Sequence, residues 1–177
     1  MLENPTGVYA LRCLSYYGGF FFSPIYNGFV WSTDWKKASC TLELDEFEEV
    51  PCDRHGPTGG CGFHGVWEFN SVRDFIRSIQ GQATVIVLAE YAGKIVAHER
   101  GLRASFCRVR AVLDWDVKAE LSAWQWGVPM MSPPNLVPFA CKHFSAPLIH
   151  QRDIPKLVDG ARNKISVTKD GFSNLAI

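Results

Sequence analysis

Two short Cys-x-x-His units stand close together in the chain, Cys52 with His55 and Cys61 with His64. Thiolate sulfur and imidazole nitrogen are preferred zinc ligands, and a two-residue spacing lets a tight turn direct both side chains of a unit toward one ion. The surrounding loop is rich in glycine, which permits the backbone angles of such a turn. These four residues predict a structural zinc site, with Cys40 as a substitute ligand; a loop held by packing alone is the alternative.

The same residues allow a catalytic interpretation. A thiolate nucleophile such as Cys61 needs a histidine as base, here His64 or His55, and is favoured by a helix N-terminus that lowers its pKa. The helix expected from residue 71 begins too far along the chain to act on Cys61 directly. Nothing in the linear sequence sets the geometry of this pair, and we lean toward a protein that is not an enzyme.

Three arginines lie along the strand expected at 102–113, namely Arg103, Arg108 and Arg110. Side chains two residues apart on a strand share a face, so Arg108 and Arg110 project to the same side. Guanidinium groups bind phosphate through paired hydrogen bonds. Trp124 and Trp126 could stack on a base or a peptide. These five residues are candidate ligand-binding residues, although solvated strand charges explain the arginines equally well and core packing is the favoured interpretation of the two tryptophans.

The motif Cys-Gly-Phe-His-Gly at 61–65 is followed by a stretch, 93–104, that contains Val-Ala-His-Glu-Arg-Gly-Leu-Arg-Ala. Together they resemble small bacterial and phage-associated proteins with a Cys-Gly-x-x-small motif and a Gly-x-x-Val-x-His-Glu-x-Gly-x-Arg-Ala strand. The resemblance covers about residues 40–104. Those proteins carry a second cysteine two positions before the motif cysteine, where this chain has Gly59, so the resemblance leaves the ligand set open and implies no activity.

Composition limits the classes of function. The chain has 177 residues, 47% of them hydrophobic and 13% aromatic, which suits one domain with a sizeable core. Eighteen basic residues balance eighteen acidic ones, so there is no overall positive field to attract bulk nucleic acid. A neutral, aromatic-rich chain favours a protein partner or self-association.

The sequence lacks the basic start and apolar run of a secretory signal, and no stretch has the length of a membrane span. We therefore expect a cytoplasmic protein with no membrane partner. In a reducing compartment its six cysteines should not form a disulfide framework.

Hydrophobic periodicity predicts an α+β fold with a mostly antiparallel sheet, a meander or small barrel-like arrangement. One clear helix is expected at 71–80, where Ser71 and Asp74 form a capping box and Gly81 ends the helix. The expected strands are 8–14, 20–22, 29–31, 84–91, 94–99 and 102–113.

The C-terminal part is expected to add one or two short helices, at 117–126 and 153–163. Between them, four prolines predict an extended Pro-rich arm at 128–138 within a single domain, 1–177.

Two functions follow from these patterns. The first is a non-enzymatic binding, adaptor or inhibitor domain, with zinc as its cofactor and an aromatic, proline-rich surface that contacts another protein. The alternative is a small enzyme or nucleotide-binding protein that uses Cys61, His64 and His98, with the three arginines around a pocket.

Overall fold

The computed structural model describes the main part of the chain, with gaps. The described residues are 7–24, 30–40, 50–51, 61–78, 83–115, 136–162 and 172–175.

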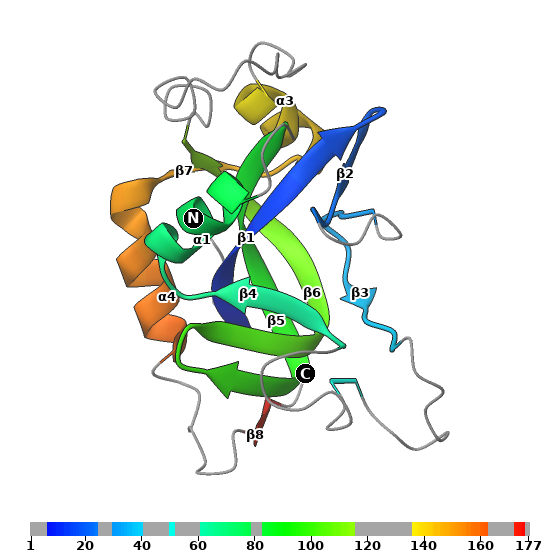
Figure 1. The fold of residues 1–177 in the computed structure, drawn as a ribbon, viewed down its shortest axis with the longest axis vertical. Coiled ribbons are helices and arrows are strands. Elements are labelled where there is room, and N and C mark those ends of the chain that lie inside the picture. Colours follow the sequence, from blue (N-terminus) through cyan, green and yellow to red (C-terminus); the bar gives the residue numbers. More distant parts are fainter. Residues whose placement is uncertain are drawn as a thin grey trace.

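Within these residues the chain forms a mixed, mostly antiparallel sheet with short helices around it (Figure 1). This confirms the expected α+β class. The strands are β1 (Val8–Tyr17), β2 (Phe20–Phe22), β3 (Lys36–Lys37), β4 (Phe63–Val66), β5 (Thr84–His98), β6 (Gly101–Asp114), β7 (Leu148–His150) and β8 (Phe172–Leu175). The helices are α1 (Phe69–Ser78), α3 (Leu136–Phe144) and α4 (Ile154–Arg162), with a 3₁₀ turn, η2, at Gln151–Asp153.

The centre of the fold is a ring of four strands. β1 pairs with β5, β5 with β6 and β6 with β4, all antiparallel, and a bridge between Leu11 and Val66 joins β4 back to β1. Outside the ring, β2 pairs with the end of β1, β8 pairs with β5, and both β3 and β7 pair with β6. The pairings therefore close on themselves, so a residue of β5 or β6 faces either the inside of the ring or the elements packed outside it.

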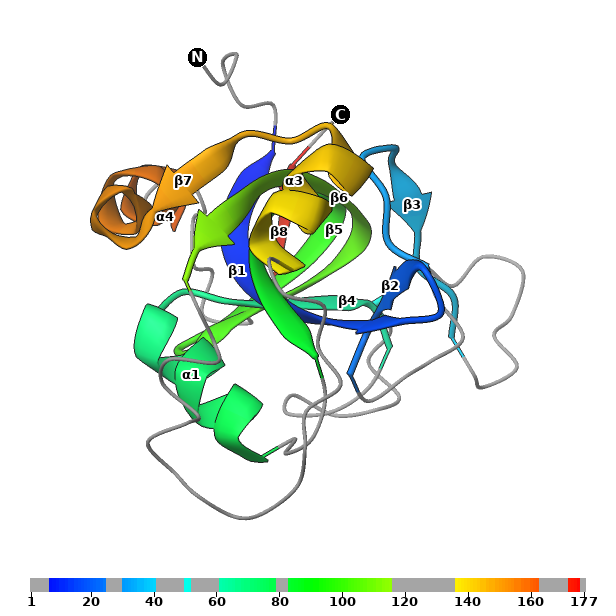
Figure 2. The same cartoon turned by 90° about the horizontal axis from the view of Figure 1, so that it is seen from above.

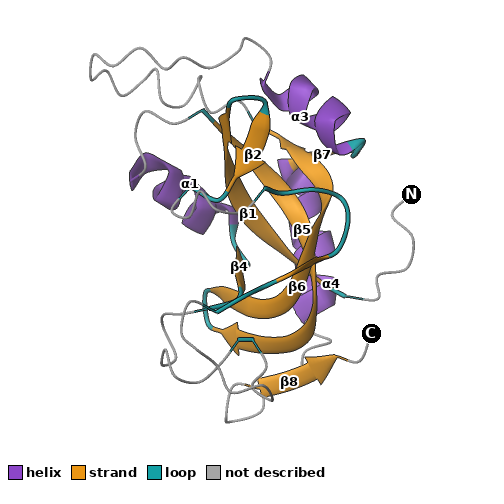
Figure 3. Ribbon diagram, turned by 90° about the vertical axis from the view of Figure 1, so that its right-hand side faces the viewer, coloured by secondary structure: helices purple, strands orange, loops and turns teal. Residues whose placement is uncertain are grey.

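Helices α1 and α4 lie on the outside of this ring, and α3 lies across one end of it (Figures 1 and 2). α1 and α4 contact β1, and α3 contacts β5 and β6 (Figures 2 and 3). As a result, residues on both faces of β1, from Val8 to Leu14, are buried apart from the half-buried Arg12, and residues 84–92 of β5 are buried on both faces as well. Burial on both faces explains why the run 85–89 is continuously apolar instead of alternating.

β5 is one long strand, whereas the sequence predicts two strands that end and begin at Ala92 and Gly93. That prediction is wrong because the register shifts between Ala92 and Ile95, which makes a bulge, and Gly93 takes a positive φ of 78° there. A glycine in this conformation bends a strand without ending it. The expected strand at 29–31 is reduced, in its described part, to a single bridge between Val30 and Phe22.

α1 confirms the predicted amphipathic helix but begins at Phe69, earlier than expected. Ser71 therefore lies inside the first turn, so the predicted capping box is wrong, and Asp74 pairs instead with Arg77 in the next turn at 3.3 Å. The predicted end of the helix at Gly81 lies outside the described residues. No helix in the described part of the chain is long and apolar enough to cross a membrane.

The predicted Pro-rich arm at 128–138 is wrong at its end, because residues 136–138 belong to helix α3. Pro138 lies in the first turn of this helix, where the backbone N–H has no partner within the helix and proline is tolerated. The rest of the arm and the helix predicted at 117–126 lie outside the described residues. α4 confirms the helix predicted at 153–163.

Candidate functional site

A buried carboxylate lies between the long strands of the ring. Glu90 of β5 is only 1% exposed, and its cross-strand neighbours are Tyr9 on β1 and Arg108 on β6. Residues directly opposite each other in an antiparallel pair project from the same face, so these three side chains form one row. A carboxylate removed from water is stable only when charged or polar groups pair with it.

Both oxygens of Glu90 have partners. Arg108 donates to Oε2 from Nε at 2.9 Å and approaches it with Nη2 at 2.8 Å. Arg110 places its Nε 3.5 Å from the same oxygen. The backbone N–H of Gly7 donates to Oε1 at 3.1 Å. Two guanidinium groups therefore share one carboxylate, and we call Tyr9, Glu90, Arg108 and Arg110 the charged cluster.

The outer side of the charged cluster is reached from solvent. The side chains of Arg108 and Arg110 are 24% and 22% exposed, and the Arg108 guanidinium lies over the ring of Trp35, 4.4 Å from its centroid. Trp35 immediately precedes β3, whose Lys37 pairs with Phe106 of β6. The exposed Lys37 is thus on the same face of this edge as Arg108.

Tyr9, like Arg110 at its Nε, has a buried polar atom without a hydrogen bond of good geometry among the described residues. Its side chain is buried, and its hydroxyl makes no hydrogen bond of good geometry to any described residue. Burial raises the pKa of Tyr9 and the Glu90 carboxylate raises it further, whereas Arg110 and Arg108 act in the opposite direction. The hydroxyl therefore stays protonated, a donor beside a carboxylate whose oxygens already have partners.

Sequence reasoning identified the two arginines of this cluster but missed Glu90, Tyr9 and Trp35. A signal for Glu90 was present, because it is the one charged residue in the apolar stretch 84–93. A carboxylate there must have a cationic partner, and the next strand offers Arg108 and Arg110. Tyr9 and Trp35 carried no such signal, since their role depends on strand pairing across long distances in the sequence.

The third predicted arginine, Arg103, belongs to a different place. Arg103 and Arg108 are five residues apart on β6, so their side chains lie on opposite faces of the strand. The cross-strand neighbours of Arg103 are His64 of β4 and Val96 of β5. Arg103 is 3% exposed, and its Nη1 donates to the carbonyl oxygen of Cys61 at 3.4 Å. The enzyme or nucleotide-binding alternative requires the three arginines around one pocket, but in the structure Arg103 lies apart from Arg108 and Arg110.

His98 ends β5 on the same side as Arg103. Partial burial lowers its pKa, and the Arg103 charge lowers it further, so His98 is neutral at pH 7. Glu99 follows in the exposed turn between β5 and β6. His98 and Glu99 thus lie where the β5–β6 hairpin turns.

The predicted zinc ligands lie partly outside the described residues. Cys52 and His55 are among those not described, and so are Trp124 and Trp126. Cys61 is buried just before β4, and His64 is exposed within it. Among the described residues no three His, Cys, Asp or Glu side chains come together as a metal site would require. The zinc site stays a prediction.

Cys40, the predicted substitute ligand, is half-buried at the end of the described segment 30–40. Two further cysteines, Cys13 and Cys107, lie in the core. Burial raises the pKa of Cys13 to about 12 and also raises that of Cys107. Their thiols are protonated at neutral pH, which excludes them as nucleophiles.

The motif at 61–65 has a clear structural role. The carbonyl oxygen of His64 accepts hydrogen bonds from Arg12 Nη1 and, at 2.9 Å, from the hydroxyl of Tyr91. Arg12 also donates from Nη2 to Ser23 Oγ at 2.8 Å and stacks on the ring of Trp31, 4.6 Å from its centroid. These contacts attach β4 to β1 and β5 and help to close the ring.

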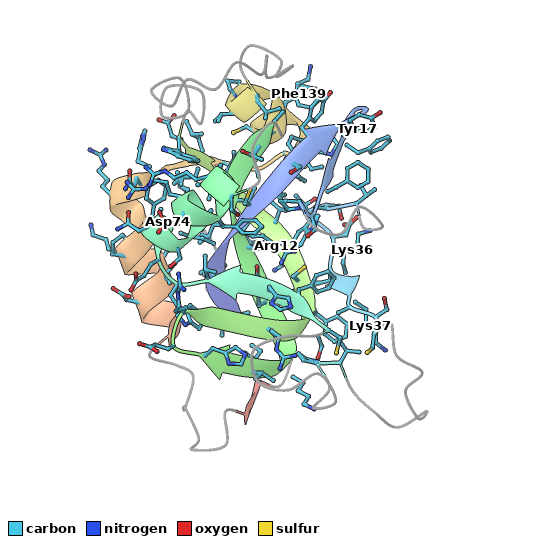
Figure 4. All side chains as sticks on the ribbon, in the orientation of Figure 1. Arg12, Tyr17, Lys36, Lys37, Asp74 and Phe139 are labelled. Atoms are coloured by element: carbon cyan, nitrogen blue, oxygen red, sulfur yellow. The ribbon has the colours of Figure 1, made fainter. Side chains whose placement is uncertain are left out.

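A cluster of aromatic side chains reaches the surface at the end of the fold where the β1–β2 hairpin meets α3. Tyr17 is 81% exposed, Phe20 51% and Phe139 38%. Tyr16 lies against Phe139, with ring centroids 5.2 Å apart, and Phe139 stacks on His143 at 6.1 Å. We call these five residues the aromatic surface; Figure 4 shows Tyr17 and Phe139 at this end, away from Lys36 and Lys37 of β3.

Comparison of the chain with family models, with curated proteins and with solved structures finds no match. The charged cluster and the aromatic surface are therefore interpreted from their own geometry and chemistry.

Proposed function

We propose that this protein is a binding domain without catalytic function, and that its aromatic surface contacts an apolar, acidic segment of another protein. The observation that carries the proposal is the exposure of Tyr17 and Phe20 together at one hairpin tip, at the same end of the fold as Phe139 of α3 (Figure 4). Aromatic side chains dominate the binding energy of protein interfaces, because each removes a large area from water with few rotatable bonds.

The aromatic surface is supported from beneath by the core. Phe21 is fully buried, and its ring lies 5.3 Å from Tyr16, 6.1 Å from Phe139 and 4.9 Å from the buried Phe144. These contacts hold Tyr16 and Phe139 in place before a partner arrives. Preorganisation of this kind reduces the entropy lost on binding.

The hairpin tip is also restrained. Gly18 and Gly19 both take positive φ, 59° and 92°, as a two-residue hairpin turn requires. β1 and β2 continue in register up to this turn, with Tyr17 opposite Phe20. The two most exposed aromatic residues in the described part of the chain are therefore a cross-strand pair at the end of a regular ladder.

Charge indicates the chemistry of the partner. The tip, residues 16–22, carries no charged side chain, whereas the last turn of α3 next to Phe139 has exposed Lys142 and His143. A partner segment with aromatic or aliphatic side chains for the tip and a carboxylate for Lys142 complements both parts. Such a charge at the rim of an interface favours rapid association and selects the partner.

The test uses random peptides displayed on phage, panned against the wild-type protein. We expect enriched peptides that combine apolar and acidic residues, and we expect the double variant Tyr17→Ser, Phe20→Ser to bind them at least about thirtyfold more weakly, a loss of about 2 kcal/mol. Calorimetry on synthetic copies of the peptides measures the affinity. Leu148→Ser is the matched control, because Leu148 is 46% exposed but lies on β7.

Two outcomes would overturn the proposal. One is that no sequence is enriched, or that the enriched peptides bind the double variant as tightly as the wild type. The other is a homodimer, seen by analytical ultracentrifugation, that the same two substitutions dissociate, since the aromatic surface would then be occupied by a second copy of the chain.

A further inference from the structure

We propose that the outer side of the charged cluster, together with Lys37 of β3, binds a phosphate group. This goes beyond the protein-binding function, because it concerns a different surface and a different ligand. The residues that would contact the phosphate are Arg108, Arg110 and Lys37, while Glu90 and Trp35 position the guanidinium groups.

The first argument is the balance of charge. One arginine is enough to neutralise the buried Glu90, yet Arg108 and Arg110 both approach the same carboxylate oxygen. Among the described residues of the charged cluster and its neighbour, the exposed Lys37 on the same face, three cations stand beside one carboxylate. A second cation held beside an already neutralised carboxylate leaves a local positive charge, and a phosphate dianion would balance it.

The second argument is the balance of hydrogen bonds. Each guanidinium has five N–H donors, and the two oxygens of Glu90 accept from Arg108, from the backbone of Gly7 and, more distantly, from Arg110. The buried hydroxyl of Tyr9 has no acceptor among the described residues. Among the described residues the cluster thus has more donors than acceptors, and the oxygens of a phosphate would supply acceptors to the arginines, allowing Tyr9 to turn toward Glu90.

The third argument is positioning. Arg108 uses its Nε and Nη2 edge for Glu90, and the face of its guanidinium lies on Trp35, so the plane of the group is set from two sides. Its remaining donors are directed away from Glu90, on a side chain that keeps 24% of its surface exposed. Arginines held in this way recognise planar or tetrahedral oxyanions through paired hydrogen bonds.

The phosphate could be inorganic or could belong to a nucleotide. Isothermal titration calorimetry at constant ionic strength, with inorganic pyrophosphate as one probe and ADP as the other, distinguishes the two sources. We expect saturable binding of at least one probe at millimolar concentrations. Tighter binding of ADP would identify a nucleotide, and equal or tighter binding of pyrophosphate an inorganic ligand.

Variants show whether the binding uses this cluster. Arg110→Gln keeps the closer Arg108–Glu90 pair and should weaken binding at least about tenfold, the loss expected for a charge-assisted hydrogen bond. Arg77→Gln, which removes a cation paired on the surface of α1, should leave binding unchanged. If circular dichroism shows that the Glu90→Gln variant is folded, this variant should bind the probe more tightly, because the competing carboxylate charge is gone.

The proposal is overturned if neither probe binds the wild-type protein, or if Arg110→Gln binds the probe as tightly as wild type. Arg110→Gln keeps the test decisive if Glu90→Gln does not fold. None of these outcomes alters the aromatic surface, so the protein-binding function would stand or fall separately.

Discussion

The charged cluster and the aromatic surface depart from the usual distribution of residues in opposite ways. The cluster places Glu90 inside the protein with two arginines around it, whereas the aromatic surface leaves Tyr17 and Phe20 in water. Buried charge is stable only with partners in the same chain, and Glu90 has them. Exposed aromatic rings gain from contact with a partner, and among the described residues none covers Tyr17 or Phe20. The comparison teaches that removing the buried charge of the cluster should cost folding stability, while removing a ring from the aromatic surface should cost binding.

The largest effect is expected for Glu90→Ala. This change leaves two guanidinium groups without their carboxylate at a site of low dielectric constant, and the free energy of unfolding should fall by about 3–5 kcal/mol. Urea denaturation followed by tryptophan fluorescence measures it. Glu99→Ala, in the exposed turn between β5 and β6, is the control and should change stability by less than about 0.5 kcal/mol. Equal effects of the two changes would remove the distinction between the cluster and an ordinary surface charge.

A smaller effect, in the opposite direction, is expected for Tyr9→Phe. The change removes a buried hydroxyl that has no good acceptor among the described residues and keeps the ring that packs in the core. The free energy of unfolding should be unchanged or rise by up to about 1 kcal/mol, because an unsatisfied buried polar group is lost. A fall of more than about 1 kcal/mol in the same urea experiment would mean that the hydroxyl makes a strong hydrogen bond and that the cluster is complete as it stands.

The smallest effect on folding is expected for Tyr17→Ser. The side chain is 81% exposed, so its loss should alter the free energy of unfolding by less than about 0.5 kcal/mol. Thermal and urea unfolding of the variant beside wild type provide the measurement. A loss above about 1 kcal/mol would show that Tyr17 serves the fold, and the aromatic surface would then resemble the charged cluster instead of contrasting with it.

Local patterns predicted much of the secondary structure. Apolar runs indicated β1, β2 and β6, and the spacing of Val72 and Ile76 indicated α1. Errors occurred where one residue type has two structural uses. Gly93 accommodates a bulge instead of a turn, and Pro138 fits the first turn of a helix instead of excluding one.

The candidate sites were predicted less completely. Arg108 and Arg110 were recognised as neighbours because they share a face two residues apart. Their partner Glu90 stands 18 residues before Arg108, and Tyr9 lies on a strand far from both, so only the registers of β1 with β5 and of β5 with β6 bring them together. The exposure of Tyr17 was equally invisible, since a Tyr-Tyr-Gly-Gly-Phe-Phe-Phe stretch looks the same whether its rings face the core or water.

The sequence by itself determined the α+β class, the balance of charge and the places of the longer strands and of α1 and α4, because propensity and periodicity act over a few residues. The tertiary structure alone decided that β4 closes the ring, that Arg103 is separated from Arg108 and Arg110, and that one carboxylate is shared by two arginines. These features depend on strand register between distant segments, and a shift of one residue in a register would move each side chain to the opposite face.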